Sequence, residues 1–172
     1  MLLKYLGEEG AGCPLSAAVA VSAPIDLSEV SRNMLRLRNR LYHRYLLRQM
    51  KAEATAPGAI LSADERAAIA GSATIWDYDQ RFIAPRHGFA GADDYYERCK
   101  PVRFMGYIRV PTLVIAGLDD PWIPGRLYQG YDWTANKALR PALLARGGHV
   151  GFHGAGQTQP WSDLAVSRFI GA

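Results

Sequence analysis

Three short apolar runs, each bounded by a proline, constrain the fold of this 172-residue chain more than any other feature. They cover residues 17–23, 112–116 and 142–145, and the two intervals between them differ greatly in length. Continuous apolar runs of this kind are typical of strands that are buried on both faces, as they are in parallel sheets. The sequence therefore predicts an α/β fold with three parallel strands.

An acidic residue and a histidine follow the second and third runs. Asp120 lies in the segment 111–124 (PTLVIAGLDDPWIP), and His149 lies in the segment 141–153 (PALLARGGHVGFH). Functional side chains gather at the carboxyl ends of parallel strands, so we expect these two to meet. An imidazole titrates near neutral pH and a carboxylate can orient it, which is the chemistry of a general base and its acid. Asp followed by His is also the order that α/β-hydrolases use after their nucleophilic serine.

Other residues of the same types are weaker candidates. Asp120 fits an acid-bearing loop through the pattern Gly-x-x-Asp, whereas Asp119 fits a turn or a helix cap. Ser22 follows the first run but lacks the flanking glycines of a nucleophile elbow. His153 stands at the spacing of a helical metal site from His149, but the surrounding glycines argue against a helix, so no metal is expected. Of the two remaining histidines, His43 is expected at the surface of the Arg-rich helix, and His87 is expected to have a structural role.

Composition excludes several classes of protein. No apolar stretch reaches the 18 or more residues of a membrane-spanning helix, and the N-terminus lacks the apolar core of a secretory signal. The glycines of residues 7–12 lack the Lys-Ser/Thr of a phosphate loop, so no nucleotide cofactor is expected. Cys13 and Cys99 form neither a disulfide framework nor a metal motif, which favours a cytoplasmic location. A net charge of +4 is too small to indicate nucleic acid.

Residues 26–105 form a long insertion between the first two runs, and residues 28–54 within it are predicted to be one helix. Apolar residues recur on one face of this helix: Val30, Met34, Leu37, Leu41 and Tyr45. Arginines recur every fourth residue on another face: Arg32, Arg36, Arg40, Arg44 and Arg48. An i+4 row drifts by only about 40° per step, so these arginines would form one basic ridge. Two interpretations stay open: a solvated outer face, or a surface that contacts anionic lipid headgroups or an acidic partner.

Three further helices are expected. Residues 2–6 have helical apolar spacing without an N-cap residue. Residues 61–70 begin with Ser62 as N-cap and Glu65 in position to complete a capping box. Residues 161–170 are predicted to form a closing helix that ends at a glycine.

Several of these segments resemble the C-terminal half of the YheT-like α/β-hydrolases, a family with bacterial members and eukaryotic ABHD-type relatives. The matching segments span most of the chain: MLLKYLGEEG, AAVAVSAPIDL, DYDQRFIAPRHGFAGADDYYERC, PTLVIAGLDDPWIP and GGHVGF. The resemblance implies that residues 1–172 are a partial α/β-hydrolase domain, with its last three parallel strands and flanking helices, and that residues 26–105 form a helical cap. It also implies hydrolysis of carboxylic or lipid esters without a cofactor, with Asp120 as the triad acid and His149 as the general base.

The sequence departs from this family at the nucleophile. In the family, G-x-S-x-G-G-N directly precedes the segment that here reads MLLKYL, and this chain contains no G-x-S-x-G. The resemblance therefore implies that the serine, the oxyanion amides and the first five strands lie upstream of this chain. Loss of a triad serine costs about 10⁶ in turnover, so the chain alone is expected to be inactive. The alternative function is a non-catalytic remnant that binds anionic lipid or an acidic partner through its arginines.

Overall fold

The chain divides into a sheet unit and a helical unit. The computed structural model describes residues 1–154, 156 and 158–171. The sheet unit comprises Met1–Asp26 and Lys100–Ala172, and the helical unit is Leu27–Cys99. The helical unit therefore falls inside residues 26–105, the range that the sequence marks as an insertion.

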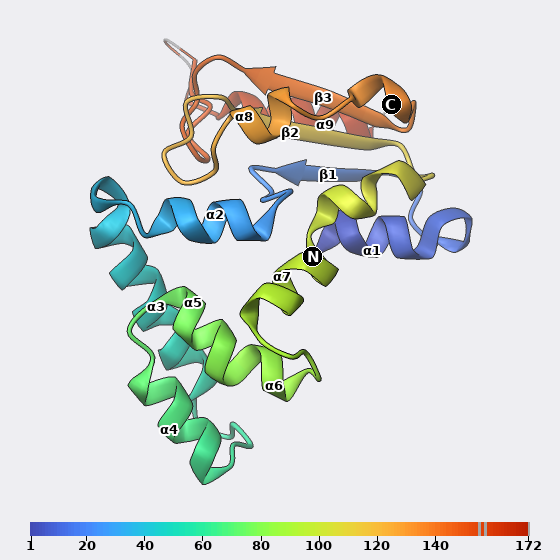
Figure 1. Ribbon diagram of the computed structural model, residues 1–172. Helices are drawn as coiled ribbons and strands as arrows, with labels where there is room; N and C mark the ends of the chain where they lie inside the picture. The colour runs from blue at the N-terminus through green and yellow to red at the C-terminus, as the bar shows by residue number, and fades with distance from the viewer. Residues whose placement is uncertain (155, 157, 172) are drawn as a thin grey trace. The chain divides into compact units, whose positions relative to one another are not determined.

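Three parallel strands in the order β1-β2-β3 form the sheet (Figure 1). Their bounds are Ala18–Val21 for β1, Thr112–Gly117 for β2 and Leu139–Leu144 for β3. β2 lies between the other two and is the most buried, in keeping with its unbroken apolar run. The α/β fold class predicted from the sequence is confirmed.

The third strand is longer than its apolar run suggests. β3 begins at Leu139, three residues before the predicted start, and it contains Pro141. A proline cannot donate a ladder hydrogen bond, so the sequence favoured a strand that starts after it. β3 pairs with β2 alone among the described residues, and prolines are tolerated in such edge strands.

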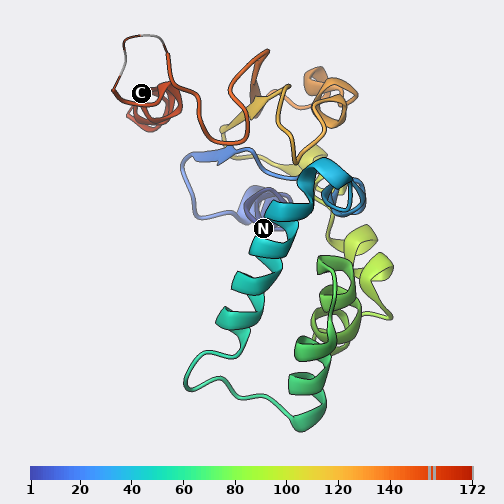
Figure 2. The same ribbon diagram turned by 90° about the vertical axis from the view of Figure 1, so that its left-hand side faces the viewer.

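Helices cover both faces of the sheet. Figure 2 shows α9 (red) on one side of the strands and α8 (orange) on the other. Their bounds are Trp161–Ile170 for α9, as predicted, and Arg126–Gln129 for α8. α1, at Leu2–Glu9, extends beyond the predicted residues 2–6 because its helix continues through Gly7. Short 3₁₀ segments complete the unit at Gly10–Gly12, Pro101–Arg103, Met105–Tyr107 and Trp133–Ala135.

Gly7 lies where α1 packs tightly against the chain that leads into β2. It is buried, together with Leu3 and Leu6 on the same face of α1. A Cβ atom at Gly7 would overlap the backbone carbonyl oxygen of Phe104. Because backbone atoms cannot move aside as a flexible side chain can, α1 packs at this distance only with glycine there.

We expect Gly7→Ala to destabilise the protein, although alanine is normally the better helix former. Alanine gains about 0.5–1 kcal/mol over glycine inside a helix, but the overlap with Phe104 is expected to cost about 1–3 kcal/mol or more. Urea unfolding measures the difference. Gly12→Ala is the control, because no atom lies within 4 Å of a Cβ built there. An unchanged or higher midpoint for Gly7→Ala would contradict the close packing.

The helical unit packs around one apolar cluster. Residues from α3, α4, α5 and η3 form its buried centre, namely Leu47, Ile69, Tyr78 and Phe82. The helices of the unit are α2 (Leu27–Met34), α3 (Arg40–Ala54), α4 (Ala63–Gly71), α5 (Ile75–Tyr78), α6 (Ala84–Arg86) and α7 (Ala92–Cys99). A 3₁₀ turn, η2 (Leu37–Asn39), precedes α3, and a π-helical turn, η3 (Asp79–Ile83), joins α5 to α6.

The prediction of one helix over residues 28–54 is wrong. The chain leaves the helix after Met34, passes through an extended residue at Arg36 and resumes at Arg40. The side-chain amide of Asn39 donates a hydrogen bond to the carbonyl oxygen of Asn33 at 2.9 Å, and both residues are buried. Asparagine side chains compete with helical backbone bonds in this way, so the pair stabilises the break.

Two local predictions in the helical unit had different outcomes. The capping box is confirmed: the Glu65 amide donates to Ser62 Oγ at 3.1 Å, and the Ser62 amide donates to Glu65 Oε2 at 2.8 Å. The expectation of a surface position for His43 is wrong, since its ring is buried and its Nε2 accepts a hydrogen bond from the Ile75 amide at 3.1 Å.

Among the helices described, none combines the length and the apolar composition that a bilayer span requires.

Candidate active site

The loop after β2 holds Asp120 rigidly through its own backbone. Asp120 Oδ1 accepts hydrogen bonds from the amides of Trp122 at 2.8 Å and Ile123 at 3.1 Å. An aspartate that caps the next residues of its own turn is a common way to fix a short loop. The side chain is almost fully buried, and its second oxygen, Oδ2, is left to face another group.

That second group is His149. The distance from His149 Nδ1 to Asp120 Oδ2 is 2.8 Å, so the structure brings together the two residues that the sequence singled out. A carboxylate at Nδ1 favours the tautomer that carries its proton there, which leaves Nε2 as the basic nitrogen. The His149 side chain is 26% exposed, against 1% for Asp120. The pair therefore has a buried acid and an accessible imidazole.

The surroundings of Asp120 keep it ionised at neutral pH. Burial by itself raises the pKa of this carboxyl, but the hydrogen bonds from His149 and from the Trp122 and Ile123 amides outweigh burial and hold it below its ordinary value. An ionised carboxylate can balance the positive charge of a protonated imidazole. This is the electrostatic condition that a general base needs when it accepts a proton.

A residue of the loop after β2 also holds the loop after β3. Gly148 adopts a left-handed conformation with φ of 59°, and its amide donates to Asp119 Oδ1 at 2.9 Å. Asp119 thus fixes the turn in which His149 stands, and Asp120 holds the ring. The imidazole also packs against the Trp122 ring in a T-shaped arrangement, with ring centroids 4.5 Å apart. Trp122 was missed in the sequence, because nothing in the segment LDDPWIP indicates which way its ring points.

Ser22, at the end of β1, holds the backbone of His149. Its Oγ donates a hydrogen bond to the His149 carbonyl oxygen, and its side chain is buried. Its φ of 47° lies in the left-handed region, which non-glycine residues seldom adopt. Such strain persists where the surrounding structure requires it, often beside functional residues. Residues beyond all three strand ends therefore converge on His149.

At position 22 we expect the glycine variant to be more stable than the alanine variant, which is the reverse of the usual order. Ser22→Ala removes the hydroxyl and is expected to cost about 1–3 kcal/mol, because the carbonyl loses its partner. Ser22→Gly loses the same bond but relieves about 1 kcal/mol of left-handed strain, so it should unfold at the higher urea concentration of the two. The control is exposed Ser167 in α9, where alanine should be more stable than glycine. A Ser22→Ala variant as stable as Ser22→Gly would contradict the strained conformation.

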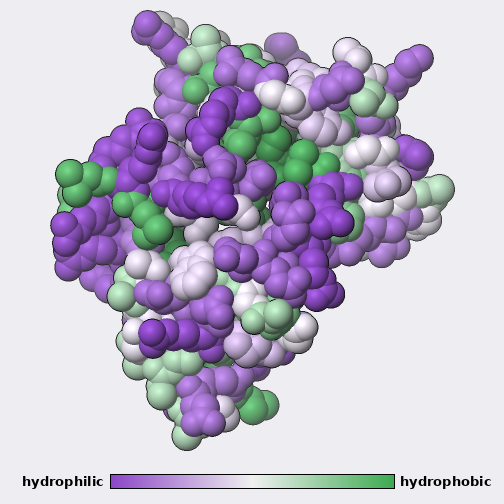
Figure 3. All heavy atoms as spheres, viewed as in Figure 1, coloured by the Kyte–Doolittle hydropathy of each residue, from purple (hydrophilic) through white to green (hydrophobic). Residues whose placement is uncertain are grey.

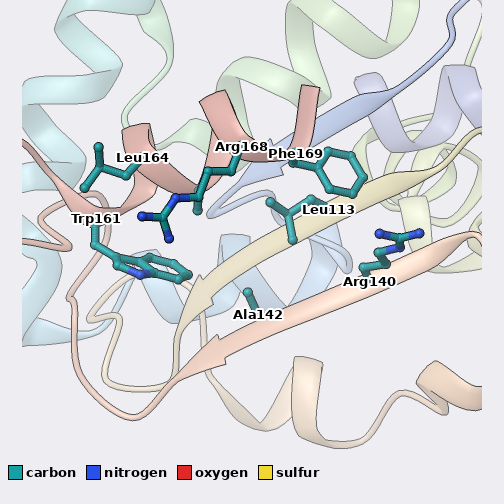
Figure 4. A pocket seen from close by; sticks show the side chains of 8 residues that line it. Leu113, Arg140, Ala142, Trp161, Leu164, Arg168 and Phe169 are labelled. Carbon is teal, nitrogen blue, oxygen red and sulfur yellow. The ribbon is translucent and has the colours of Figure 1, made fainter. Parts of the chain in front are cut away.

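His153 lines a cavity of about 340 Å³ together with Gly147, Phe152 and Trp161. A second cavity, of about 510 Å³, lies between α9 and the face of β2 and β3 (Figure 4). In it Arg140 lies over the ring of Phe169, 5.6 Å from the ring centroid.

Within the described residues, no three His, Cys, Asp or Glu side chains are grouped so that they could hold a metal ion.

Comparison with known proteins gives consistent matches. No family model matches the chain. The chain is 34% identical over 177 residues to the Escherichia coli (strain K12) protein named "Putative esterase YheT", an alignment that covers 99% of this chain and 51% of that protein. It is 25% identical to an abhydrolase domain-containing protein of Dictyostelium discoideum, over 99% of this chain and 44% of that protein. It is 28% identical to phospholipase ABHD3 of Mus musculus, over 88% of this chain and 38% of that protein. The chain thus spans about half the length of the curated relatives it matches, or less.

Proposed function

Because this chain is homologous to YheT-like esterases and ABHD-family α/β-hydrolases, we propose that it supplies the acid and the base of a serine ester hydrolase. Its parallel sheet with flanking helices matches part of an α/β-hydrolase fold. The observation that carries the proposal is the 2.8 Å contact between Asp120 Oδ2 and His149 Nδ1. The helical unit, within residues 26–105, would be the cap of this hydrolase.

The proposed reaction uses His149 first as a base and then as an acid in each of its two steps. Nε2 accepts the proton of a serine hydroxyl as the serine oxygen forms a bond to the ester carbonyl carbon. His149 then gives this proton to the leaving alcohol oxygen as the ester C–O bond breaks. Water then attacks the acyl carbon as Nε2 takes its proton, the bond from this carbon to the serine oxygen breaks, and Nε2 returns the proton to that oxygen as the acid is released. In each step Asp120 holds the ring and balances the positive imidazolium.

The serine and the oxyanion amides would come from the half of the hydrolase that this chain does not cover. No G-x-S-x-G elbow occurs in its 172 residues. Without the nucleophile, we propose that the chain alone has no measurable esterase activity. Carboxylic or lipid esters are the proposed substrates, since the relatives include proteins named esterase and phospholipase.

The test begins with the form of the protein that the cell contains. A C-terminal tag at the native locus allows purification, intact-mass measurement and labelling with a serine-reactive fluorophosphonate. We expect a species of about twice 18.9 kDa that labels and hydrolyses p-nitrophenyl esters. Absence of both labelling and hydrolysis from every species that contains this chain would overturn the proposal.

A second candidate function is binding to an anionic surface through Arg32, Arg36, Arg40, Arg44 and Arg48. One observation favours it: residues 30–52 contain no Asp or Glu. The broken helix changes the form of this surface, because α3 carries only the last three of these arginines. Binding of this kind weakens with added salt. It should disappear when Arg36, Arg40 and Arg44 become Gln and remain when His149 becomes Ala. Binding that does not respond to salt would contradict it.

A further inference from the structure

Two leucines of the apolar stripe predicted from the sequence, Leu37 and Leu41, are exposed at the break between α2 and α3, beside the exposed Leu35. Leu37 is 83% exposed and Leu41 is 82% exposed, and Leu35 is about half exposed. Figure 3 shows apolar side chains, in green, among hydrophilic ones over this part of the helical unit, at the left of the view. We call residues 35–44 the corner. Neighbouring leucines exposed to this degree indicate a surface that contacts something apolar.

The corner is also strongly basic. Arg36, Arg40 and Arg44 are exposed around the leucines, and the nearest acidic residues in the sequence are Glu29 and Glu53. Glu29 is already paired with Arg32, at 2.6 Å between Oε1 and Nη1. The partner that complements this charge is therefore anionic.

A cavity of about 320 Å³ within the helical unit has Leu35 in its lining. Arg40, Arg44 and Thr74 contribute polar groups to its lining, and Met34 and Leu35 contribute apolar ones. His43 also lines it, but its Nε2 already accepts the Ile75 amide, and burial lowers the pKa of its ring. The two guanidinium groups are thus the cations of the cavity, and guanidinium groups suit phosphate oxygens.

We propose that the corner is a binding site for the phosphate headgroup of an anionic lipid. Arg40 and Arg44 would contact the phosphate, and Leu37 and Leu41 would enter the acyl layer. This inference rests on the second candidate function and names its site. A bilayer fits these observations better than an acidic protein does, because leucines can enter lipid without a complementary pocket opposite them. Basic side chains around inserted apolar ones are typical of surfaces that lie in the membrane interface.

Co-sedimentation of the native protein with vesicles tests the site. We expect binding to phosphatidylcholine vesicles that contain phosphatidylglycerol, and little binding to phosphatidylcholine alone. Arg40→Gln with Arg44→Gln should weaken binding by roughly five-fold per arginine. Leu37→Ser with Leu41→Ser should weaken it by about ten-fold or more. All four residues are exposed, so these variants should keep the circular dichroism spectrum and melting temperature of the parent.

The matched control removes the same charge elsewhere in the helical unit. Arg86→Gln with Arg98→Gln should change binding by less than about two-fold, because Glu65 and Asp94 already neutralise these arginines. If the two arginine pairs have equal effects, or if the leucine variant binds normally, the corner is not the site although lipid binding stands. If inorganic phosphate removes the protein from vesicles, or a polyglutamate peptide binds as tightly, the lipid assignment is overturned. If no vesicle binds, the second candidate function fails as well.

Discussion

Replacing His149 by Ala is expected to abolish ester hydrolysis by the form of the protein that contains the nucleophile. Without Nε2, no group removes the serine proton, and loss of a triad base costs about 10⁶ in turnover. The measurement is kcat for a p-nitrophenyl ester, with near-UV circular dichroism to check the fold. The matched control is His153→Ala, four residues further on and exposed, which should retain activity within a few-fold.

Asp120→Asn tests the other half of the same pair and should lower kcat by about 10⁴. The Asn carbonyl oxygen can still accept from the Trp122 and Ile123 amides, so the loop keeps its shape. Its NH₂ group then faces His149 Nδ1 and can donate a hydrogen bond only when Nδ1 carries no proton. The neutral imidazole therefore carries its proton on Nε2, which can no longer accept the serine proton. Normal activity in either variant would contradict the proposed roles of Asp120 and His149, even if the protein remained an esterase.

The helical unit is expected to lose stability as the pH rises from about 4 to 6, through Asp79. This carboxyl lies in η3, where burial raises its pKa from 3.8 to about 6, partly offset by the hydrogen bond from Tyr96, at 2.5 Å. Tyr78 and Tyr95 also lie within its electrostatic reach. The native state therefore holds a proton that the unfolded chain has released.

The sign and size of this effect follow from linkage. The stabilisation is fully present below the unfolded pKa of 3.8 and is lost as the pH rises through the native value of about 6. The shift corresponds to about 3 kcal/mol, at 1.36 kcal/mol for each pKa unit. Carboxyls such as Asp120, whose pKa is lowered, lose their contribution as the pH falls through the native pKa below 3.8, which is a separate window.

Asp79→Asn isolates the contribution of this one residue, because the amide does not titrate. We expect the variant to lack the fall in stability between pH 4 and 6 and to melt several degrees above the parent at pH 7.5. Thermal melts followed by circular dichroism at both ends of the range give the comparison. Asp64→Asn, at an exposed carboxyl in α4, should leave the slope unchanged. If the melting temperatures of the parent and Asp79→Asn change with pH in the same way, ionising Asp79 does not destabilise the native state and the prediction is contradicted.

Patterns that act over a few residues were sufficient for much of the fold. The capping box at Ser62 needs only residues within one helical turn, and α9 has the predicted bounds because its spacing is strongly helical. The helix break at residues 35–39 was missed, although Asn33 lies just before it and Asn39 ends it. Asparagine only weakly disfavours a helix, so the break became clear only when both side chains were seen to be buried.

The sequence by itself determined the parallel sheet and the nomination of Asp120 and His149, because strand patterning is local and strand ends converge in any parallel sheet. Only the tertiary structure decided how His149 is held. Ser22 and Trp122 contact it, and Asp119 holds the preceding residue, Gly148, through contacts whose geometry no periodicity encodes. The tertiary structure also decided that Leu37 and Leu41 face outward, because a helix that ends early changes which side of the chain is buried.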